Sequence, residues 1–479
     1  MIPLASYDQK IAAVLGLGRT GLSACQALAA GGGRIWAWDD DEARRAAASA
    51  KGVPIVNLDI CNWERVASLI LSPGIPLRHP RPHRLVRRAR AAGLPVIGDM
   101  ELLAENQPGR RIVGVTGTNG KSTTSALIAR VLQHAAIGTQ LGGNIGLPVL
   151  DLLPKPHDDI YVLELSSYQL DLTERLKCAV AVILNLSPDH LDRHGGMAGY
   201  VRAKRRILRN QDAESWAIIG VDDADGQKIC KQLRAARDRR VAPISAGGAA
   251  KDGVAKDGVY VIDGRLIDDL DGAAREVGDL RPITHLQGVH NWQNAAAAYA
   301  VARALGVTPE QALDGMTGFP GLAHRMEMVG RIDGVRFVND SKATNPDAAA
   351  RALACYRPIY WIAGGQAKQD DLDAVLPHLD RVKRAYLIGD ATDRFAALLA
   401  DRLDCVACGD LGHAVRAAAD DARRDRLDGA TVLLAPAAAS FDQFADFEAR
   451  GDAFRALVED LSDAPLRDTT RSLAVGGRS

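Results

Sequence analysis

A glycine-rich loop in the first third of the chain has the composition of an anion-binding turn. The stretch TGTNGKST, residues 116–123, follows the apolar run IVGV and precedes SALIARVL, which has a helical pattern. Exposed backbone N–H groups, a helix N-terminus and a lysine together suit a nucleotide phosphate. The residues that would surround the phosphate are Gly117, Thr118, Asn119, Gly120, Lys121, Ser122 and Thr123.

The loop departs from the strict phosphate-loop pattern at one position, because Val115 stands where the first glycine is expected. A turn that only caps a helix with Ser or Thr is therefore the alternative interpretation. The order of strand, loop and helix is nevertheless the one that a phosphate loop needs. We therefore predict a nucleotide site, in which Lys121 neutralises phosphate oxygens and the hydroxyl of Ser122 or Thr123 binds Mg²⁺.

Two further apolar strands carry polar side chains where they end. Glu164 closes the run YVLE, and Asp189, His190 and Asp192 follow the run AVAVILNL. A buried carboxylate needs a compensating partner, and Mg²⁺ usually takes one or two carboxylates. Taken singly, Asp189 can be a helix cap and His190 a surface histidine. Because parallel strand ends meet at one edge of a sheet, we predict a metal-bearing site beside the phosphate loop.

A second glycine motif lies near the N-terminus. GLGRTG, residues 16–21, follows a strand pattern and opens a helix, and Asp39 ends the next strand about 20 residues later, the spacing of a dinucleotide fingerprint. Read alone, the motif indicates a nicotinamide-dependent oxidoreductase. The same glycine amides and helix N-terminus suit any diphosphate. LSPGI adds a second loop, from Ser72 to Gly74.

The composition limits the class of protein. The chain has 479 residues, 47% hydrophobic and 25% charged, with a formal net charge of zero. This is typical of a globular protein with no global attraction to nucleic acid or to anionic membranes. Seven scattered cysteines do not form a disulfide framework, and the single pair Cys405 and Cys408 lacks the partners of a zinc site. With no signal-like or membrane-spanning run, we expect a cytoplasmic protein.

The elements that position these residues form three α/β blocks. Short apolar strands alternate with helical stretches, which predicts parallel sheets covered by helices. We expect an N-terminal Rossmann-like domain (1–98), a central phosphate-loop ATPase-type α/β domain (99–321) and a C-terminal Rossmann-like domain (322–479). We expect residues 222–279 to be peripheral, and the polar tail 464–479 to be loosely ordered.

Seven short motifs occur in one order over roughly residues 10 to 460: GTNGKST, GGNIG, LELSSYQL, LNLSPDHLDRH, GVHNWQN, HRME and NDSKATN. In this the chain resembles the Mur ligases, whose ATP loop has the form TGTNGK[ST]. The resemblance implies that ATP phosphorylates the alanyl carboxylate of UDP-N-acetylmuramoyl-L-alanine and that the amine of D-glutamate displaces phosphate. The product is a peptidoglycan precursor. We expect no nucleic-acid or membrane partner, and a monomer.

The resemblance also implies roles for individual residues. Lys121, Glu164, His190 and Lys204 would be catalytic; Ser122, Glu164, His190 and Lys204 would surround Mg²⁺, with Lys204 carbamylated. A solvated basic helix is the alternative for Lys204. The phosphate loop would bind ATP with Asn291, Arg325, Asp340 and Lys342, although Asn291 could also be a helix cap. The UDP-substrate residues would be Gly18, Thr20, Asp39, Ser72, Gly74 and Asn144. The glutamate residues would be Thr344, Lys368, Ser440 and Phe447.

Two positions depart from the family pattern. Relatives often have a basic residue just after the strand-end acid, whereas this chain has an acidic run from Asp39 to Glu42, for which Arg19 would compensate. Ala438 stands where relatives commonly have cysteine.

Other functions remain open at this stage. They are a ligase that uses L-glutamate or another amino acid, including a folylpolyglutamate-type enzyme, the oxidoreductase above, and a catalytically silent partner protein. The N-terminal glycine motif disfavours the folate enzyme, and the intact motifs disfavour the silent protein.

Overall fold

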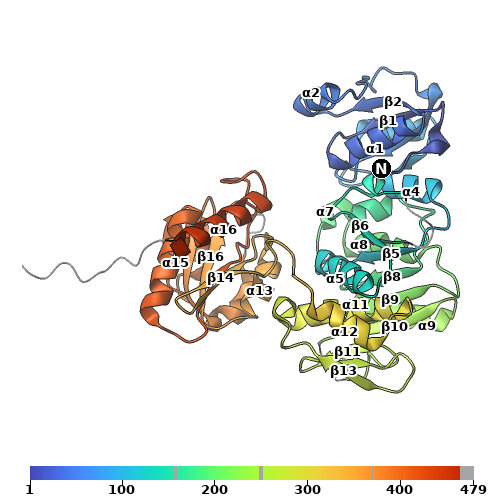
Figure 1. The fold of residues 1–479 in the computed structure, drawn as a ribbon. Helices are drawn as coiled ribbons and strands as arrows, with labels where there is room; N and C mark the ends of the chain where they lie inside the picture. Colours follow the sequence, from blue (N-terminus) through green and yellow to red (C-terminus); the bar gives the residue numbers. More distant parts are fainter. Residues whose placement is uncertain (155–158, 248–251, 368–370, 464–479) are drawn as a thin grey trace, which may run out of the picture. The chain divides into compact units, whose positions relative to one another are not determined.

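The computed structural model describes residues 1–154, 159–247, 252–367 and 371–463. The chain forms two compact units, Met1–Phe319 and Pro320–Ser479. The predicted α/β class is confirmed, because three separate sheets are mostly parallel and are covered by helices (Figure 1). Among the described helices, none combines the length and the apolar character needed to cross a membrane.

The first unit begins with a four-stranded parallel sheet in the order β2-β1-β3-β4. Its strands are β1 (Ile11–Leu15), β2 (Arg34–Trp38), β3 (Val66–Leu71) and β4 (Val96–Ile97). The helices are α1 (Arg19–Ala30), α2 (Glu42–Ala50), α3 (Arg84–Ala91) and α4 (Asp99–Asn106), with short 3₁₀ turns Ala5–Tyr7 and Trp63–Arg65. Alternate residues of β1 face opposite cores: Val14 packs in the cluster that contains α1, and Leu15 in the cluster that contains α3.

A nine-stranded sheet completes the first unit, in the order β13-β12-β11-β10-β9-β8-β5-β7-β6. Its strands are β5 (Ile112–Thr116), β6 (Thr139–Gly143), β7 (Ile160–Glu164), β8 (Val180–Ile183), β9 (Trp216–Gly220), β10 (Arg240–Ser245), β11 (Val259–Ile262), β12 (Arg265–Asp268) and β13 (Arg275–Asp279). Strands β5 to β11 are parallel, and the edge strands β12 and β13 are antiparallel, so the later part of residues 222–279 lies at the sheet edge as expected.

Helices of very different lengths accompany this sheet (Figure 1). They are α5 (Lys121–His134), α6 (Ser167–Asp171), α7 (Leu191–His194), α8 (Met197–Arg205), α9 (Ala224–Ala236), α11 (Val289–Ala304) and α12 (Pro309–Thr317), with 3₁₀ turns Val149–Asp151, Arg206–Leu208 and Thr284–Leu286. Helix α11 packs on α5 and is buried along its alanine run, because small side chains allow close packing against the neighbouring elements.

The second unit contains a six-stranded sheet in the order β14-β15-β19-β16-β17-β18, with only β14 antiparallel. The strands are β14 (Glu327–Ile332), β15 (Val335–Asn339), β16 (Ile359–Gly364), β17 (Val382–Ile388), β18 (Cys405–Gly409) and β19 (Thr431–Leu434). The helices are α13 (Pro346–Leu353), α14 (Thr392–Leu399), α15 (Leu411–Asp425) and α16 (Phe447–Asp463), with a 3₁₀ helix at Asp373–Arg381.

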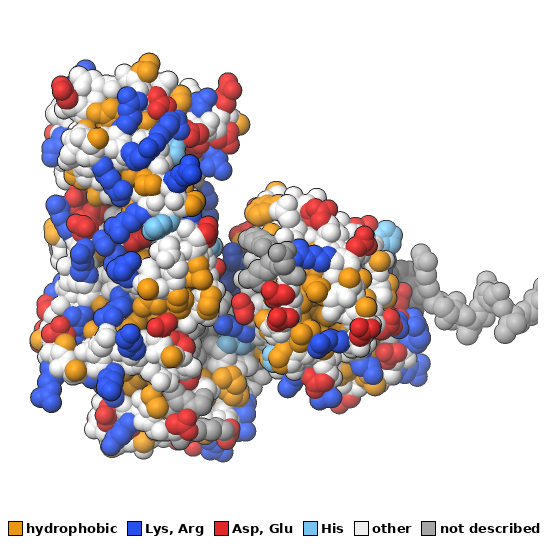
Figure 2. Space-filling view, turned by 180° about the vertical axis from the view of Figure 1, so that it is seen from behind, with side chains coloured by type: hydrophobic (Ala, Val, Ile, Leu, Met, Phe, Trp, Pro, Cys, Tyr) orange, Lys and Arg blue, Asp and Glu red, His pale blue; other side chains and the backbone are white. Residues whose placement is uncertain are grey.

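This sheet separates two cores. Trp361 of β16 packs in the cluster with α13 and α14, whereas Tyr360 and Ile362 pack in the cluster with α15 and α16. Cys405 and Cys408 pack against different clusters as well, so they lie on opposite faces of β18. Basic and acidic side chains are both visible on the face of each unit shown in Figure 2, in keeping with the zero net charge.

Candidate functional site

The order of strands in the large sheet brings the predicted phosphate loop and the predicted acids to one edge. Strand β5 pairs with β7 on one side and with β8 on the other. The chain reverses its direction of winding at β5, and the C-terminal end of such a strand is where ligands usually bind in parallel α/β sheets. Gly117 follows β5, Glu164 ends β7, and Asn185 follows β8. The loop, the carboxylate and the segment with His190 therefore start at adjacent strand ends.

The phosphate loop is shaped for close approach of a ligand to its backbone. Gly120 is the N-cap of α5 with φ +82°, a conformation that favours glycine. A Cβ atom at this position would lie 2.3 Å from Oδ1 of Asn294, so any other residue would displace that side chain. Lys121 Nζ donates to the carbonyl oxygens of Gly117 (3.0 Å) and Thr118 (2.8 Å), which places the ammonium over its own loop.

Asn185 fixes the loop, and sequence reasoning missed it. Its backbone oxygen accepts from Thr118 N (2.9 Å), its Oδ1 accepts from Asn119 N (2.9 Å), and its Nδ2 donates to Asn119 O (3.1 Å). A polar residue two positions after the end of the buried strand β8 was the available signal. Tyr200, whose hydroxyl lies 3.1 Å from Thr118 Oγ1, carried no comparable signal.

Helix α11 also holds the helix that follows the phosphate loop in place. Oδ1 of Asn294 accepts from Thr124 Oγ1 (3.1 Å), and its Nδ2 donates to Oδ1 of Asn291 (3.1 Å). Asn291 is buried and also donates to Gln287 O (2.9 Å). The predicted ATP residue Asn291 therefore lies in a hydrogen-bonded chain that leads to the helix of the phosphate loop.

Glu164 is the buried carboxylate that the sequence indicated. Only 2% of the residue is exposed, and its Oε1 accepts from Asn144 Nδ2 at 2.7 Å. Its Oε2 is buried and has no hydrogen-bond partner among the described residues. An unpaired carboxylate oxygen is costly unless a cation compensates it, and an oxygen of this kind is a suitable ligand for Mg²⁺.

Lys204 of α8 is buried beside the same loop. It is 2% exposed, and its Nζ donates to Gly117 O at 2.7 Å and lies 4.6 Å from the centre of the Tyr200 ring. Burial, followed by the charge of Lys121, holds the pKa of the Lys204 amine well below its ordinary value, while Asp189 and Glu164 act in the opposite direction. These charged groups are therefore close enough to influence one another, and the amine is inclined to be neutral.

His190 lies at the rim of this cluster. It is the N-cap of α7 with φ +51°, its Nε2 lies 3.6 Å from Asp189 Oδ2, and its ring centre is 5.2 Å from that of Tyr168. Burial lowers the pKa of His190, Asp189 raises it, and Lys121 lowers it again.

The described residues contain no group of three or more His, Cys, Asp and Glu side chains that could hold a metal ion by themselves. Mg²⁺ at this edge would therefore need further oxygen ligands, such as the Ser122 hydroxyl and a carbamate on Lys204. With the unpaired oxygen of Glu164, the residues present fit such an ion.

A cavity of about 610 Å³ contains all the residues predicted for the UDP substrate. It lies within the first unit, and its walls come from the loops after β1, β2 and β3 and from the end of β6. The predicted residues in its lining are Gly18, Thr20, Asp39, Ser72, Gly74 and Asn144. Gly18 is the N-cap of α1, and a Cβ atom there would meet nothing within 4 Å, so the helix N-terminus faces open space.

The two acids of the run that line this cavity, Asp39 and Asp40, both have partners. Asp39 is buried and accepts from Leu17 N (2.7 Å) and Asp41 N (3.0 Å), so it fixes the glycine loop. Arg84, and then His83, hold the pKa of Asp40 well below its ordinary value. Arg19, which we expected to compensate, lines the cavity and donates to Gly146 O at 2.5 Å.

In the second unit, three loops meet at the C-terminal edge of adjacent parallel strands β15, β19 and β16. Asp340 and Lys342 follow β15. Asp340 is buried, and burial raises the pKa of its carboxyl to about 7, against the opposing effects of Arg325 and a hydrogen bond from Met326 N. Lys342 Nζ lies 3.5 Å from the centre of the Phe447 ring, a short cation–π contact that pairs a predicted ATP residue with a predicted glutamate residue.

Arg450 of α16 joins two of these loops, and sequence reasoning missed it. It is 1% exposed, donates to Ser341 O (2.8 Å) and Oγ (3.0 Å), and donates to the carbonyls of Ala438 and Ala439. Ala438, the departure noted above, takes part through its backbone oxygen.

Three predicted glutamate residues lie among the described residues of this edge. Ser440 is buried next to Ala439, while Thr344 and Phe447 are partly buried. Lys368 lies outside the described residues.

Two family models match the chain. The Mur ligase middle domain matches residues 115–302, and the Mur ligase glutamate ligase domain matches residues 324–438. Together with the relatives described next, these matches show that the chain belongs to the Mur ligase family of enzymes.

Individual relatives are more specific. The UDP-N-acetylmuramoylalanine--D-glutamate ligase of Caulobacter vibrioides is 53% identical over 468 residues, covering 96% of this chain and 98% of that protein. The ligase of the same name from Paramagnetospirillum magneticum is 47% identical, with 96% and 98% covered. Among solved structures, MurC of Thermotoga maritima has a TM-score of 0.56 at 16% identity, over 94% of this chain and 99% of that one. This last similarity shows the fold alone.

Proposed function

We propose that the protein is an ATP-dependent ligase that adds D-glutamate to UDP-N-acetylmuramoyl-L-alanine, a step of peptidoglycan precursor synthesis. The observation that carries the proposal is the first edge described above: a phosphate loop, a buried carboxylate with one unpaired oxygen, and a buried lysine meet at adjacent strand ends. The names of the relatives supply the substrates. An oxidoreductase has no use for this cluster.

The chemistry would run in two steps. An oxygen of the alanyl carboxylate attacks the γ-phosphorus of ATP, the bond to the β-phosphate oxygen breaks, and an acyl phosphate and ADP result. The D-glutamate nitrogen then attacks the acyl carbon, the carbon–oxygen bond to phosphate breaks, and the amine loses a proton as the amide forms. A free carboxylate is a poor electrophile, so phosphorylation supplies the leaving group. Catalysis would consist mainly of positioning and of neutralising charge.

In this scheme, Lys121 and the loop amides bind the phosphates of ATP, and Arg325, Asp340 and Lys342 contribute to the nucleotide site. Asn144 and the glycine loop bind the UDP substrate, and Thr344, Lys368, Ser440 and Phe447 bind D-glutamate.

Mg²⁺ would be held by Ser122, Glu164, His190 and a carbamate on Lys204, and when bound it would screen the phosphate charge. The neutral amine favoured by the lowered pKa of Lys204 is the form that reacts with CO₂ to give a carbamate. Without that modification, a lysine would repel the ion.

We assign the UDP substrate to domain 1–98, ATP to domain 99–321 and glutamate to domain 322–479. We further propose that the enzyme works in the cytoplasm as a monomer, without nucleic-acid or membrane partners.

Phosphate release tests the function directly. Purified protein is given ATP, Mg²⁺ and UDP-N-acetylmuramoyl-L-alanine, with D- or L-glutamate in parallel reactions. We expect release that requires D-glutamate. Release only with L-glutamate would mean that the same mechanism makes a different product. If neither isomer stimulates phosphate release, the proposed acceptor is wrong. A Lys121→Ala variant, which lacks the loop cation, provides the blank.

A further inference from the structure

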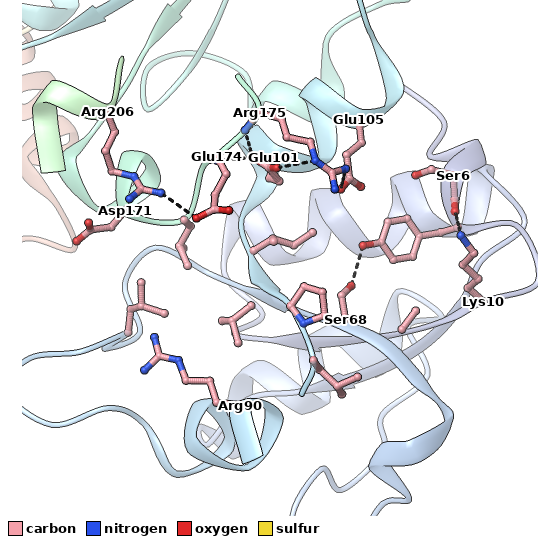
Figure 3. A pocket seen from close by; sticks show the side chains of 18 of the residues that line it. Ser6, Lys10, Ser68, Arg90, Glu101, Glu105, Asp171, Glu174, Arg175 and Arg206 are labelled. Carbon is pink, nitrogen blue, oxygen red and sulfur yellow. Dashed lines mark hydrogen bonds and ion pairs between the residues drawn. The ribbon is translucent and has the colours of Figure 1, made fainter. Parts of the chain in front are cut away.

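A second cavity of the first unit, of about 720 Å³, is not used by the proposed reaction. It lies where the start of β3 and strand β4 of the small sheet face α4, the end of α6 and the segment around Arg206 (Figure 3). Its size is that of a site for a small organic molecule. The lining is mixed: its apolar residues, which we call the floor, include Leu94, Val96, Ile97 and Leu172, and it also carries one hydroxyl pair, Tyr7 Oη to Ser68 Oγ at 2.7 Å.

Every acid that lines this cavity already has a partner. Oε2 of Glu101 accepts from the backbone N–H groups of residues 174 and 175. Glu105 pairs with Arg175 (2.7 Å), and Glu174 pairs with Arg206 (3.5 Å), contacts that are drawn in Figure 3. Asp171 lies 3.3 Å from Nδ1 of His194. The negative charge of the lining is therefore engaged locally.

Three of the five cations that line the cavity have no acidic partner among the described residues. Among the described residues, the guanidinium groups of Arg78 and Arg90, which are both exposed, have no ion pair or hydrogen bond, and Lys10 donates to a neutral acceptor, Ser6 O (2.8 Å). These cations come from different elements, and Arg78 is close enough to Arg206 to contribute to lowering the pKa of that guanidinium, after burial and Arg209. An anion between them would relieve this repulsion.

We propose that this cavity is a binding site for a small organic anion with an apolar body. The apolar floor would receive the body of the ligand, and Arg78 and Arg90 would neutralise its carboxylate or phosphate. A ligand that has only one of these features would leave the floor or the cations unused.

The site is coupled to the proposed UDP cavity by shared segments. The loop after β3 lines the UDP cavity from Ser72 to Pro76 and the second cavity at Leu77 and Arg78. Helix α6 does the same, since Gln169 faces the UDP cavity while Asp171 faces the second one. Binding that orders either segment would change affinity at the other cavity, and by linkage the effect is reciprocal.

The probe that we would use is anilinonaphthalene sulfonate, an apolar fluorescent anion. Titration of the full chain is expected to show one bound probe per chain that persists with saturating UDP. Arg90→Glu and Arg78→Glu are expected to weaken binding by about tenfold each. Arg87→Glu is the matched control, because it reverses an exposed charge on the same helix α3 outside the lining, and it should leave binding unchanged. Circular dichroism verifies that each variant is folded.

Three results would overturn the proposal. The first is complete displacement of the probe by UDP, which would place the probe in the UDP cavity. The second is equal probe binding by the parent, Arg78→Glu and Arg90→Glu. The third is displacement of the probe by inorganic phosphate as effectively as by naphthoate, which would show that the ligand needs no apolar body. The coupling requires that UDP change the dissociation constant of the probe about twofold or more, and an unchanged constant would disprove it. None of these outcomes depends on ligase activity, so the two proposals can fail separately.

Discussion

Three buried ionisable side chains, Glu164, Lys204 and Asp340, stand at strand ends or beside them. Burial of a charge is expensive, so each needs a compensating partner or a shifted protonation state. The structure leaves the three groups in different states: Glu164 keeps one unpaired oxygen that a cation could compensate, the amine of Lys204 is inclined to be neutral, and the carboxyl of Asp340 has a pKa of about 7. Their roles therefore differ in ways that single substitutions can separate.

Glu164→Gln keeps the oxygen that accepts from Asn144 and removes the charge. We expect the Mg²⁺ concentration for half-maximal activity to rise about tenfold or more, because the proposed metal ligand loses its charge, while the melting temperature is unchanged or higher. Activity measured over a Mg²⁺ titration gives the result. Glu214→Gln removes an exposed carboxylate just before β9 and should have no effect. An unchanged Mg²⁺ dependence in Glu164→Gln would exclude it as a ligand.

Lys204→Ala is expected to lose activity by about 10²-fold, because it removes the proposed carbamate and its negative charge. If the carbamate is the active form, added formate or acetate should restore part of the activity by supplying the missing carboxylate. Arg202→Ala, an exposed change on the same helix α8, serves as the control. Unimpaired turnover of Lys204→Ala would remove this residue from the mechanism.

Asp340 makes stability depend on pH. Its pKa rises from an ordinary 3.8 to about 7 on folding, so the native state retains its proton at pH values where the unfolded state has lost it. Below about pH 4 both the native and the unfolded state are protonated at this carboxyl, so it does not destabilise the fold. Between about pH 4 and 7 the free energy of unfolding falls as the pH rises. Asp340→Asn cannot ionise, so we expect it to be more stable than the parent by up to a few kcal/mol at pH 7.5 and equal at pH 3.5.

Urea unfolding of the second unit, followed at both pH values, measures this difference, and Asp401→Asn, at an exposed position, is the control. If the unfolding free energies of Asp340→Asn and the parent differ by the same amount at both pH values, titration of Asp340 is not the cause of the difference.

At the scale of elements, apolar runs and turn residues sufficed to predict the alternating strands and helices. They also sufficed to predict the loops after the strands that carry the candidate site residues. What the sequence could not show is which distant residue braces a loop. Arg450 lies on a helix about 110 residues after Ser341, and nothing in its neighbours distinguishes it from the exposed arginines of other helices. The same holds for Asn294, whose role depends on α11 packing against α5.

Arg450→Met removes the donors that hold two loop backbones, and it leaves buried carbonyl groups unsatisfied. We expect the second unit to lose about 3 kcal/mol of unfolding free energy, and the KM for D-glutamate to rise more than kcat falls. Arg455→Met removes a more exposed arginine of the same helix, paired with Glu327, and should cost less than about 1 kcal/mol. Chemical unfolding and steady-state kinetics measure both. Equal losses in the two variants would refute the bracing role.

At the scale of the whole molecule, the α/β class follows from the alternation of elements, but the grouping of sheets does not. The four-stranded and nine-stranded sheets belong to one compact unit, joined by contacts such as Ile2 N to Leu150 O (2.7 Å) and Ser23 Oγ to Asp151 (2.7 Å). These pairs are far apart in sequence and carry no local pattern. The UDP cavity and the second cavity both form where elements of the two sheets meet. The sequence therefore predicted the lining of the UDP cavity only through its motifs and did not predict the second cavity.

Because the two units have separate cores, we expect calorimetry of the full chain to show two unfolding transitions. UDP should bind only the folded first unit, and at about 100 times its dissociation constant it would add about 2.7 kcal/mol to that unit, which raises one transition by a few degrees. The midpoint temperature of the other transition should not change with UDP and should be lower in Arg450→Met. That result would assign this transition to the second unit. Gly18→Leu, which fills the open space at the N-terminus of α1, should abolish the shift. A UDP shift of both transitions would mean that the units unfold together, and a shift that survives in Gly18→Leu would place UDP elsewhere.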